Sequence, residues 1–180
     1  PVCKSGSPLG HVTASSASAT NLPTTAIVSV GIHDHLGGAF AAGGLAPRVL
    51  FDSIGTSESV VAICQKPLFD DKVATNGLTQ GAVWIEEPIY YLVGGLQTAG
   101  AALEWFRREL GGEASTSDLV RKAAAVDEPV PVFLPHLTRS QSPHPDPKAA
   151  GAFIGIKSTT TQAAMFRAVL EGIAFEARAA

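Results

Sequence analysis

The sequence has 180 residues, 46% of them hydrophobic, and a formal net charge of −3 at pH 7. This apolar content supports a compact domain with a buried core. The slightly negative charge, without a Lys/Arg cluster, argues against a nucleic-acid-binding surface. Two cysteines are too few for a disulfide framework, so the composition fits a reduced, cytoplasmic protein. No apolar stretch reaches the roughly 20 residues of a spanning helix, so we expect no membrane association.

The first part of the chain predicts a turn-rich start, then a strand, then a helix. Residues 1–25 are rich in Gly, Pro and small polar residues, which favours turns. Residues 26–30 form a β-branched apolar run that ends at Gly31 and predicts a buried strand. Residues 34–44 are small and apolar and end in two glycines, which predicts a tightly packed helix.

The remaining elements follow from hydrophobic spacing and turn residues. In chain order we expect strands over residues 48–53 and 59–64 joined as a hairpin, strands over 84–86 and 89–93, helices over 96–110 and 115–126, a strand over 132–134, a Pro-rich loop over 138–148, and a helix from about residue 160. On the helix over residues 96–110, Glu104 and Arg108 are expected to pair at i,i+4. No linker interrupts these elements, so the sequence predicts one α/β domain over residues 1–180.

Asp34 is the first candidate for chemistry. It lies between His33 and His35, after the predicted strand and at the start of the next helix. Ligand crevices open where strands of α/β sheets end, and a carboxylate there could take a proton from an attacking hydroxyl. The alternative is a helix N-cap. A zinc site completed by His136 or His144, as in a metallohydrolase, is a further alternative, although no HExxH or CxxC pattern supports it.

The second candidate is the glycine-containing turn in the segment SIGTSES. Gly55 and Thr56 could present backbone N–H groups and a hydroxyl to phosphate oxygens, although the segment lacks the P-loop pattern. An ordinary hairpin turn is the alternative. Gly94, Gly95 and Gly100 indicate a close approach of another backbone or of a ligand, or simple packing of a helix on the sheet.

Taken in order, several segments resemble the FGGY family of carbohydrate kinases. The segments SGSPLGHVT and TNLPTTAIVSVGIHDHLGGAFAAGGL resemble the family's Gly-Leu-Pro, strand and G-x-x-D region. FDSIGTSESV resembles its phosphate turn, and GGLQTAGAALEWFRREL its Gly-rich entry into a helix. LPHLTRSQSPHPDPKAAGAFIGI and FRAVLEGIAFEAR resemble its Pro-rich loop, G-x-F-x-G strand and R-A-x-x-E-G-I-A-F helix.

The resemblance implies an actin-like (ribonuclease-H-like) ATPase fold, an α/β domain whose mixed sheet is flanked by helices. It implies phosphorylation of a sugar or polyol hydroxyl with ATP and Mg²⁺. Asp34 matches the family's catalytic base and contacts the substrate, and His35 occupies a neighbouring substrate-contact position. Gly55 and Thr56 match the turn that holds the ATP phosphates, and Gly100 matches a glycine near the nucleotide.

The resemblance also implies that parts of such an enzyme lie outside this sequence. The chain lacks an initiating Met and ends inside a predicted helix, so we expect it to belong to a longer protein. The family's N-terminal domain is then its main partner, beside a small sugar or polyol substrate, and a homodimer is compatible with the family. Without that domain and the later adenine-binding segment, we expect the 180 residues alone to be inactive. The alternative is a non-catalytic, regulatory member of the fold that binds sugar or nucleotide.

Overall fold

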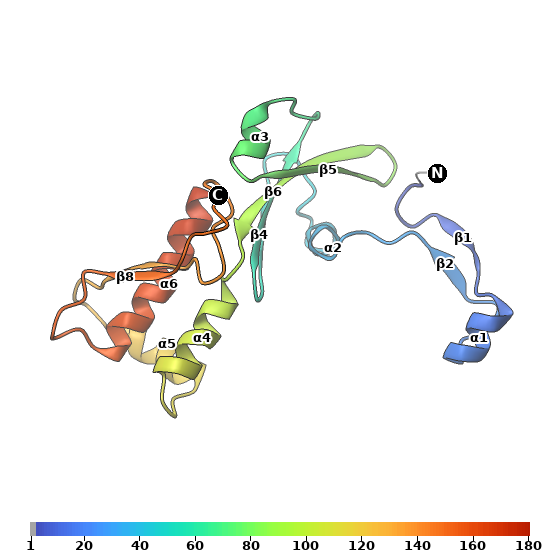
Figure 1. The fold of residues 1–180 in the computed structure, drawn as a ribbon. Helices are drawn as coiled ribbons and strands as arrows, with labels where there is room; N and C mark the ends of the chain where they lie inside the picture. Colours follow the sequence, from blue (N-terminus) through green and yellow to red (C-terminus); the bar gives the residue numbers. More distant parts are fainter. Residues whose placement is uncertain (1–2) are drawn as a thin grey trace. The chain divides into compact units, whose positions relative to one another are not determined.

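The computed structural model describes residues 3–180; residues 1 and 2, which the predicted domain includes, lie outside the described residues. Figure 1 shows the chain as a series of small sheets and helices. In order these elements are β1 (Pro8–His11), α1 (Ala14–Thr20), β2 (Ile27–Ser29), α2 (Asp34–Ala41), β3 (Leu50–Ile54), β4 (Glu58–Cys64), α3 (Asp71–Thr75), β5 (Thr79–Trp84), β6 (Pro88–Leu96), α4 (Gly100–Leu110), α5 (Thr116–Ala124), β7 (Val132–Leu134), β8 (Ala152–Ile154) and α6 (Gln162–Ala179). The predicted α/β class is confirmed.

The strands form three sheets over the described residues. β1 pairs with β2 and β7 pairs with β8, both antiparallel, while β3, β4, β6 and β5 form a four-stranded sheet in that order. β3 and β4 are neighbours in this sheet, so the predicted hairpin around Gly55 is confirmed. None of the helices within residues 3–180 is long and apolar enough to cross a bilayer.

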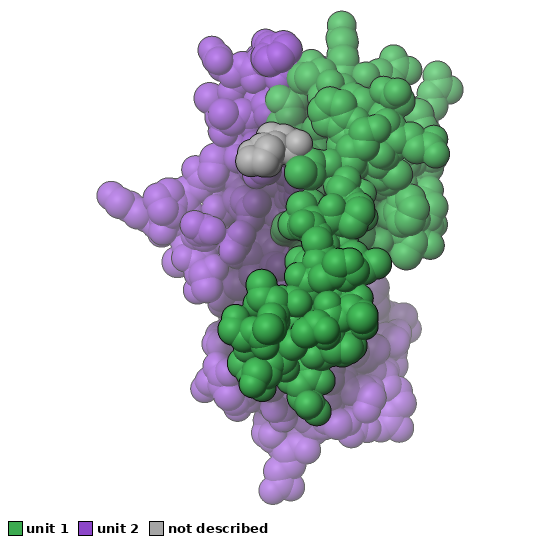
Figure 2. All heavy atoms as spheres, turned by 90° about the vertical axis from the view of Figure 1, so that its right-hand side faces the viewer, with its two compact units in different colours: residues 1–51, 62–67, 80–92 green, residues 52–61, 68–79, 93–180 purple. Residues whose placement is uncertain are grey.

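The chain divides into two compact units, coloured green and purple in Figure 2. Unit 1 comprises residues 1–51, 62–67 and 80–92, and unit 2 comprises residues 52–61, 68–79 and 93–180. The division passes through all four strands of the β3, β4, β6 and β5 sheet, so each of these strands contributes residues to both units. The two units are described separately below.

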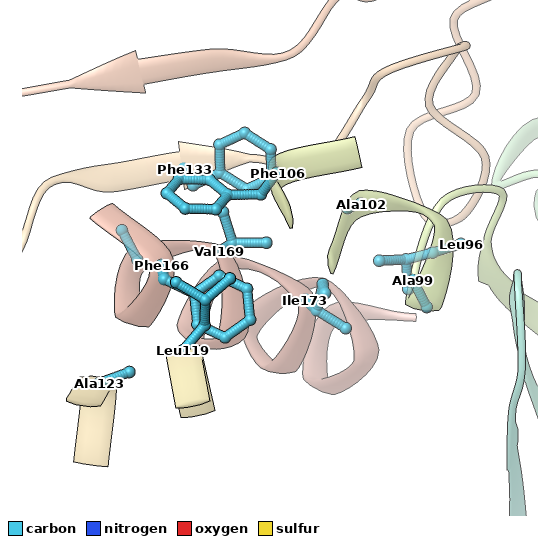
Figure 3. Close-up of a cluster of buried hydrophobic side chains, with 11 residues drawn as sticks. Leu96, Ala99, Ala102, Phe106, Leu119, Ala123, Phe133, Phe166, Val169 and Ile173 are labelled. Atoms are coloured by element: carbon cyan, nitrogen blue, oxygen red, sulfur yellow. The ribbon is translucent and has the colours of Figure 1, made fainter. Parts of the chain in front are cut away.

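Unit 2 has an aromatic and aliphatic core built around α6. The side chains labelled in Figure 3 come from β6, the N-cap of α4, α4 itself, α5, β7 and α6, and are almost fully buried. Phe106 and Phe166 meet edge to face with ring centroids 5.2 Å apart, and Phe133 lies 4.6 Å from Phe153 on the paired strand. Such aromatic packing contributes beyond simple area burial. The Thr161 hydroxyl caps α6 by accepting the N–H of Ala164.

Unit 1 buries far fewer large apolar side chains than unit 2. From α2, Leu36 and Ala39 are buried, and the side chain of Phe51 lies against Gly38 in this helix and against Gly44 just after it. Its other large apolar residues are mostly exposed in this chain: Leu9 is 60%, Ile27 66%, Phe40 58% and Leu50 69% exposed. The apolar run over residues 26–30 does contain a strand, β2. The prediction that this strand is buried is wrong, because its residues are exposed in this chain.

Several sequence predictions needed correction. The strand predicted over residues 84–86 is wrong in position, because β5 ends at Trp84. The helix predicted from residue 96 begins only at Gly100, since Leu96 is the last residue of β6. The predicted Glu104–Arg108 pair is also wrong. Glu104 instead accepts two hydrogen bonds from Arg107, at 2.6 and 2.9 Å, because the guanidinium fork at i+3 matches both carboxylate oxygens.

Two short helices were not predicted. α1 lies in a segment whose small polar residues favour turns, and α3 is only five residues long. Each is started by a side-chain cap: the Thr13 hydroxyl accepts the N–H of Ser16, and the Asp70 carboxylate accepts that of Lys72. Local capping therefore outweighs the turn preference of these residues.

Candidate functional site

Asp34 stands at the start of α2 in unit 1. The N-cap of α2 is His33, without a side-chain cap hydrogen bond, and Asp34 is the first helical residue; the N-cap alternative for Asp34 is therefore wrong by one position. The Asp34 side chain is 85% exposed, and its Oδ1 accepts the backbone N–H of His35 at 2.9 Å and lies 3.1 Å from His33 Nδ1. A carboxylate held this way is oriented by its neighbours but remains open to an incoming group.

The two histidines beside Asp34 do not build a metal site in the described residues. The rings of His33 and His35 lie with centroids 5.3 Å apart. Over residues 3–180 no group of three or more His, Cys, Asp or Glu side chains is arranged to hold a metal ion. In unit 2, Nε2 of His136 faces Glu176 Oε1 at 3.6 Å. The zinc alternative gains no support.

In unit 2, the glycine-containing turn docks onto the first residues of α4. The carbonyl oxygen of Gly55 accepts the N–H of Gly100 at 2.9 Å. The carbonyl oxygen of Thr56 accepts the N–H groups of Ala99 and Ala101 at 3.1 and 3.0 Å. The first N–H groups of a helix have no partner within the helix, so the turn supplies the missing acceptors. The outer side of the turn stays accessible, because Gly55 and Thr56 are exposed.

Gly100 is required by this docking. A Cβ atom at this position would lie 2.4 Å from the carbonyl oxygen of Gly55, far inside van der Waals contact. The close backbone approach predicted for Gly100 is therefore present, and the approaching backbone is that of the turn. Gly95 serves a similar purpose on β6: its φ is +146° and a Cβ there would lie 2.1 Å from the carbonyl oxygen of Glu58.

Glu58 is a feature that the sequence analysis missed. It follows the turn at the start of β4, is only 2% exposed, and neither carboxylate oxygen has a hydrogen-bond donor in the described residues. Burial raises the pKa of Glu58 to about 7, with further upward contributions from the negative charge of Asp52 and from the hydrogen bond that the protonated Glu58 can donate to the Asp52 carboxylate. The signal in the sequence was a charged residue opening an otherwise apolar strand, ESVVAIC.

The structure thus brings three of the predicted site residues together. Gly55, Thr56 and Gly100 form one backbone arrangement within unit 2. Asp34 and His35 belong to unit 1, where they are adjacent at the start of α2. An exposed glycine turn fixed by main-chain contacts can receive phosphate oxygens, and an exposed carboxylate can accept a proton.

Comparisons with known proteins identify the family of this chain. A family model for the C-terminal domain of the FGGY family of carbohydrate kinases matches residues 50–180. The chain therefore belongs to the FGGY family, which confirms the family inferred from the sequence. The match includes the turn, α4 and the core of unit 2, and it begins after the segment that carries Asp34.

Individual relatives extend over nearly the whole chain. The xylulose kinase of Staphylococcus epidermidis (strain ATCC 12228) is 31% identical over 179 residues, covering 97% of this chain and 35% of that protein. A crystal structure of a xyloylose kinase from Brucella ovis superposes with a TM-score of 0.78 at 26% identity, over 98% of this chain and 36% of that one.

A more distant structure shares the fold. The Plasmodium falciparum glycerol kinase with ADP superposes with a TM-score of 0.78 at 20% identity, over 98% of this chain and 35% of that one. The predicted fold is confirmed as that of the FGGY sugar kinases, which is actin-like. The chain spans about a third of the length of the curated xylulose kinases it matches.

Proposed function

We propose that this chain is part of an enzyme that transfers the γ-phosphoryl group of ATP to a hydroxyl of a sugar or polyol. The observation that carries the proposal is the exposed Gly55–Thr56 turn, fixed on the start of α4 by three main-chain hydrogen bonds in a member of the FGGY family. The relatives support the substrate class, since they are xylulose and glycerol kinases, one of them solved with ADP.

The turn is assigned to the ATP phosphates. Backbone N–H groups and the Thr56 hydroxyl would donate to phosphate oxygens from the exposed side of the turn. Gly100 would act near the nucleotide by letting α4 approach the turn, because any side chain there meets the Gly55 carbonyl. Catalysis of phosphoryl transfer depends mainly on such positioning and on stabilisation of charge.

Asp34 is assigned as the general base. Its carboxylate would take the proton of the substrate hydroxyl while that oxygen attacks the γ-phosphorus and ADP leaves with the electrons of the broken P–O bond. His35, the next residue on α2, would contact the substrate beside the reacting hydroxyl. The exposure of Asp34 in this chain leaves the carboxylate accessible to such a substrate.

Mg²⁺ and a further domain complete the proposal. The metal would be held by the nucleotide phosphates and by water, where it would neutralise charge on the transferred group. We assign residues 1–180 to the C-terminal domain of the enzyme, place the enzyme in the cytoplasm, and allow a homodimer. The N-terminal domain would supply most sugar contacts, and a later segment would flank the adenine. The 180 residues alone are then inactive and bind ATP weakly.

The test is a coupled assay of ADP release by the full-length protein, with a panel of ketopentoses, ketohexoses and polyols. We expect one substrate to raise ADP release well above the rate without substrate, and to yield a phosphorylated product. Binding of sugar or nucleotide without any product across the panel would contradict the proposal. That outcome would favour a non-catalytic, regulatory member of the fold.

A further inference from the structure

A charged side chain lies almost fully buried directly after the phosphate turn. Glu58 is 2% exposed, and in the described residues neither of its oxygens has a donor. An ionised carboxylate without partners is costly to bury, so such a group either finds a cation or takes up a proton. Over residues 3–180 no salt bridge to Glu58 is present. The structure therefore favours the protonated acid.

Asp52 can accept a hydrogen bond from the protonated carboxyl group of Glu58. It lies on β3, the strand paired with β4, and its carboxylate is exposed to solvent. Two ionised carboxylates have no proton to share, whereas a protonated Glu58 has one O–H to donate to Asp52. Burial, and then the Asp52 charge, raise the pKa of Glu58 from 4.5 to about 7. Below this pKa, protonation removes the buried negative charge and gives the O–H of Glu58 an acceptor.

The segment of β6 that lies against Glu58 and the start of α4 that contacts the turn bring no further ionisable side chain. Residues 93–96 of β6 and the first turn of α4, residues 100–103, contain only Val, Gly, Leu and Ala. The backbone of Gly95 lies against the carbonyl of Glu58 so closely that a Cβ would be 2.1 Å from its oxygen. Within the described residues, Asp52 on β3 is the titratable neighbour that shifts the pKa of Glu58.

The location of this pair ties it to the shape of the turn. Asp52 precedes the turn on β3 and Glu58 follows it on β4, so a hydrogen bond donated by the protonated Glu58 to Asp52 would join the two strands at the base of the turn. Within the turn, the N–H of Gly55 donates to the carbonyl of Ser57 at 2.8 Å, and the Gly55 carbonyl accepts from Gly100. A link at the base limits how far these contacts can open.

We propose that Glu58 is a positioning residue that shares a proton with Asp52 and so holds the Gly55–Ser57 turn in the shape that receives phosphate. The effect on phosphate rests on the proposed function, whereas the link itself does not. Opening of the turn would expose Glu58 to water, where its carboxyl ionises at its ordinary value. Opening therefore releases a proton between about pH 4.5 and 7, so it becomes easier as the pH rises through this range.

Hydrogen exchange tests the link without reference to activity. In the full-length protein, protection factors for the Gly55 and Gly100 amides, corrected for intrinsic exchange, are measured at pH 5.5 and pH 8. We expect protection to fall roughly tenfold or more between the two, because opening is coupled to loss of one proton. In E58Q, whose amide still donates to Asp52 but does not titrate, protection should stay constant. In E58L, which has no donor, it should be low at both pH values.

Two further variants sharpen this experiment. In D52N the fall in protection should move to lower pH, because the neighbouring charge that raises the pKa of Glu58 is removed. E113Q is the matched control: Glu113 is exposed and lies outside the turn, so this variant should behave as wild type. Equal falls in wild type and E58Q, or no fall in wild type, would overturn the proposed link.

Kinetics then separate the two proposals. With ATP varied at saturating sugar, KM for ATP should rise between pH 6 and 8 in wild type, and stay level in E58Q. An active enzyme whose KM profile is the same in both proteins would contradict a role of Glu58 in holding the phosphate turn. A protein without phosphoryl transfer at any pH would contradict the proposed function, and the exchange experiment would still decide on the link.

Discussion

The two units of this chain differ in how firmly they hold their candidate site residues. In unit 2, main-chain hydrogen bonds fix the Gly55–Thr56 turn on α4, and α4 in turn packs through Phe106 into a buried core. In unit 1, Asp34 begins an eight-residue helix and remains 85% exposed, among apolar side chains that are largely uncovered. The turn proposed to bind phosphate is thus preorganised by contacts within this chain, whereas the proposed base has little support from it.

The largest expected effect comes from removing the base. In the full-length enzyme, Asp34→Asn keeps the size and hydrogen-bonding capacity of the side chain but accepts no proton. We expect kcat to fall about 10²–10⁴-fold while the affinity for ATP is unchanged, because general-base catalysis contributes in that range. Steady-state kinetics with varied ATP, together with calorimetric ATP titration, measure both quantities.

A matched control is available for this substitution. Asp71 is also the first residue of a short helix, α3, and it is also exposed. Asp71→Asn should leave kcat at the wild-type value. If Asp34→Asn retained more than about a hundredth of the wild-type turnover, the assignment of the base would be withdrawn.

The next largest effect compares how firmly side chains are packed inside each unit. Phe166→Ala removes a fully buried ring from the core of unit 2 and should lower the free energy of unfolding by about 3–5 kcal/mol. Phe40→Ala removes a ring that is 58% exposed in this chain, and should change it by about 0.5 kcal/mol or less. Urea unfolding followed by circular dichroism measures both. Equal losses would show that α2 is as firmly packed as α6.

A smaller effect is expected from Gly100→Ala, which tests the docking of the turn. The new Cβ would lie 2.4 Å from the Gly55 carbonyl oxygen, so the turn must shift. We expect KM for ATP to rise roughly tenfold or more, because small misplacements of binding groups are costly. Gly172→Ala is the control, since its Cβ would meet the Phe133 carbonyl at the same 2.4 Å inside the core. It should reduce thermal stability and leave KM for ATP unchanged in the folded protein.

The smallest effect concerns the pH dependence of stability. The pKa of Glu58 is raised from 4.5 to about 7 in the folded chain, so the folded state binds more protons than the unfolded state between these values. Stability contributed by this group is therefore complete below about pH 4.5 and is lost as the pH rises through about 7. In thermal melts, the Tm of Glu58→Gln minus the Tm of wild type should be roughly a few degrees larger at pH 8 than at pH 5. A constant difference would contradict the raised pKa.

Much of the fold could be predicted because its signals are local. The strand over residues 132–134 and the helix beginning near Ser115 follow from apolar runs and caps, and the structure has β7 and α5 there. The start of α4 was placed too early, because Leu96 fits both a helical pattern and a buried strand. Only the contact with the turn at Gly100 decides between them.

The candidate site was predictable to a lesser degree. The turn around Gly55 was recognised from its motif, yet its docking on α4 depends on a contact between residues 45 positions apart in the chain. Glu58 was missed because a single glutamate in an apolar strand is usually exposed, and only the packing of β6 against it shows that it is buried. Long-range packing, rather than local pattern, decides both.

The docking of the turn also has a consequence for how this chain tolerates substitution. All three hydrogen bonds between the turn and α4 join main-chain atoms, so the anchor places no demand on the side chains at positions 56 and 57. It demands glycine at position 100 instead. In a library randomised at these three positions and selected for folding alone, glycine should dominate at position 100 while many residues survive at 56 and 57. Any stronger preference for threonine at 56 under selection for activity would then measure what the nucleotide, rather than the fold, requires.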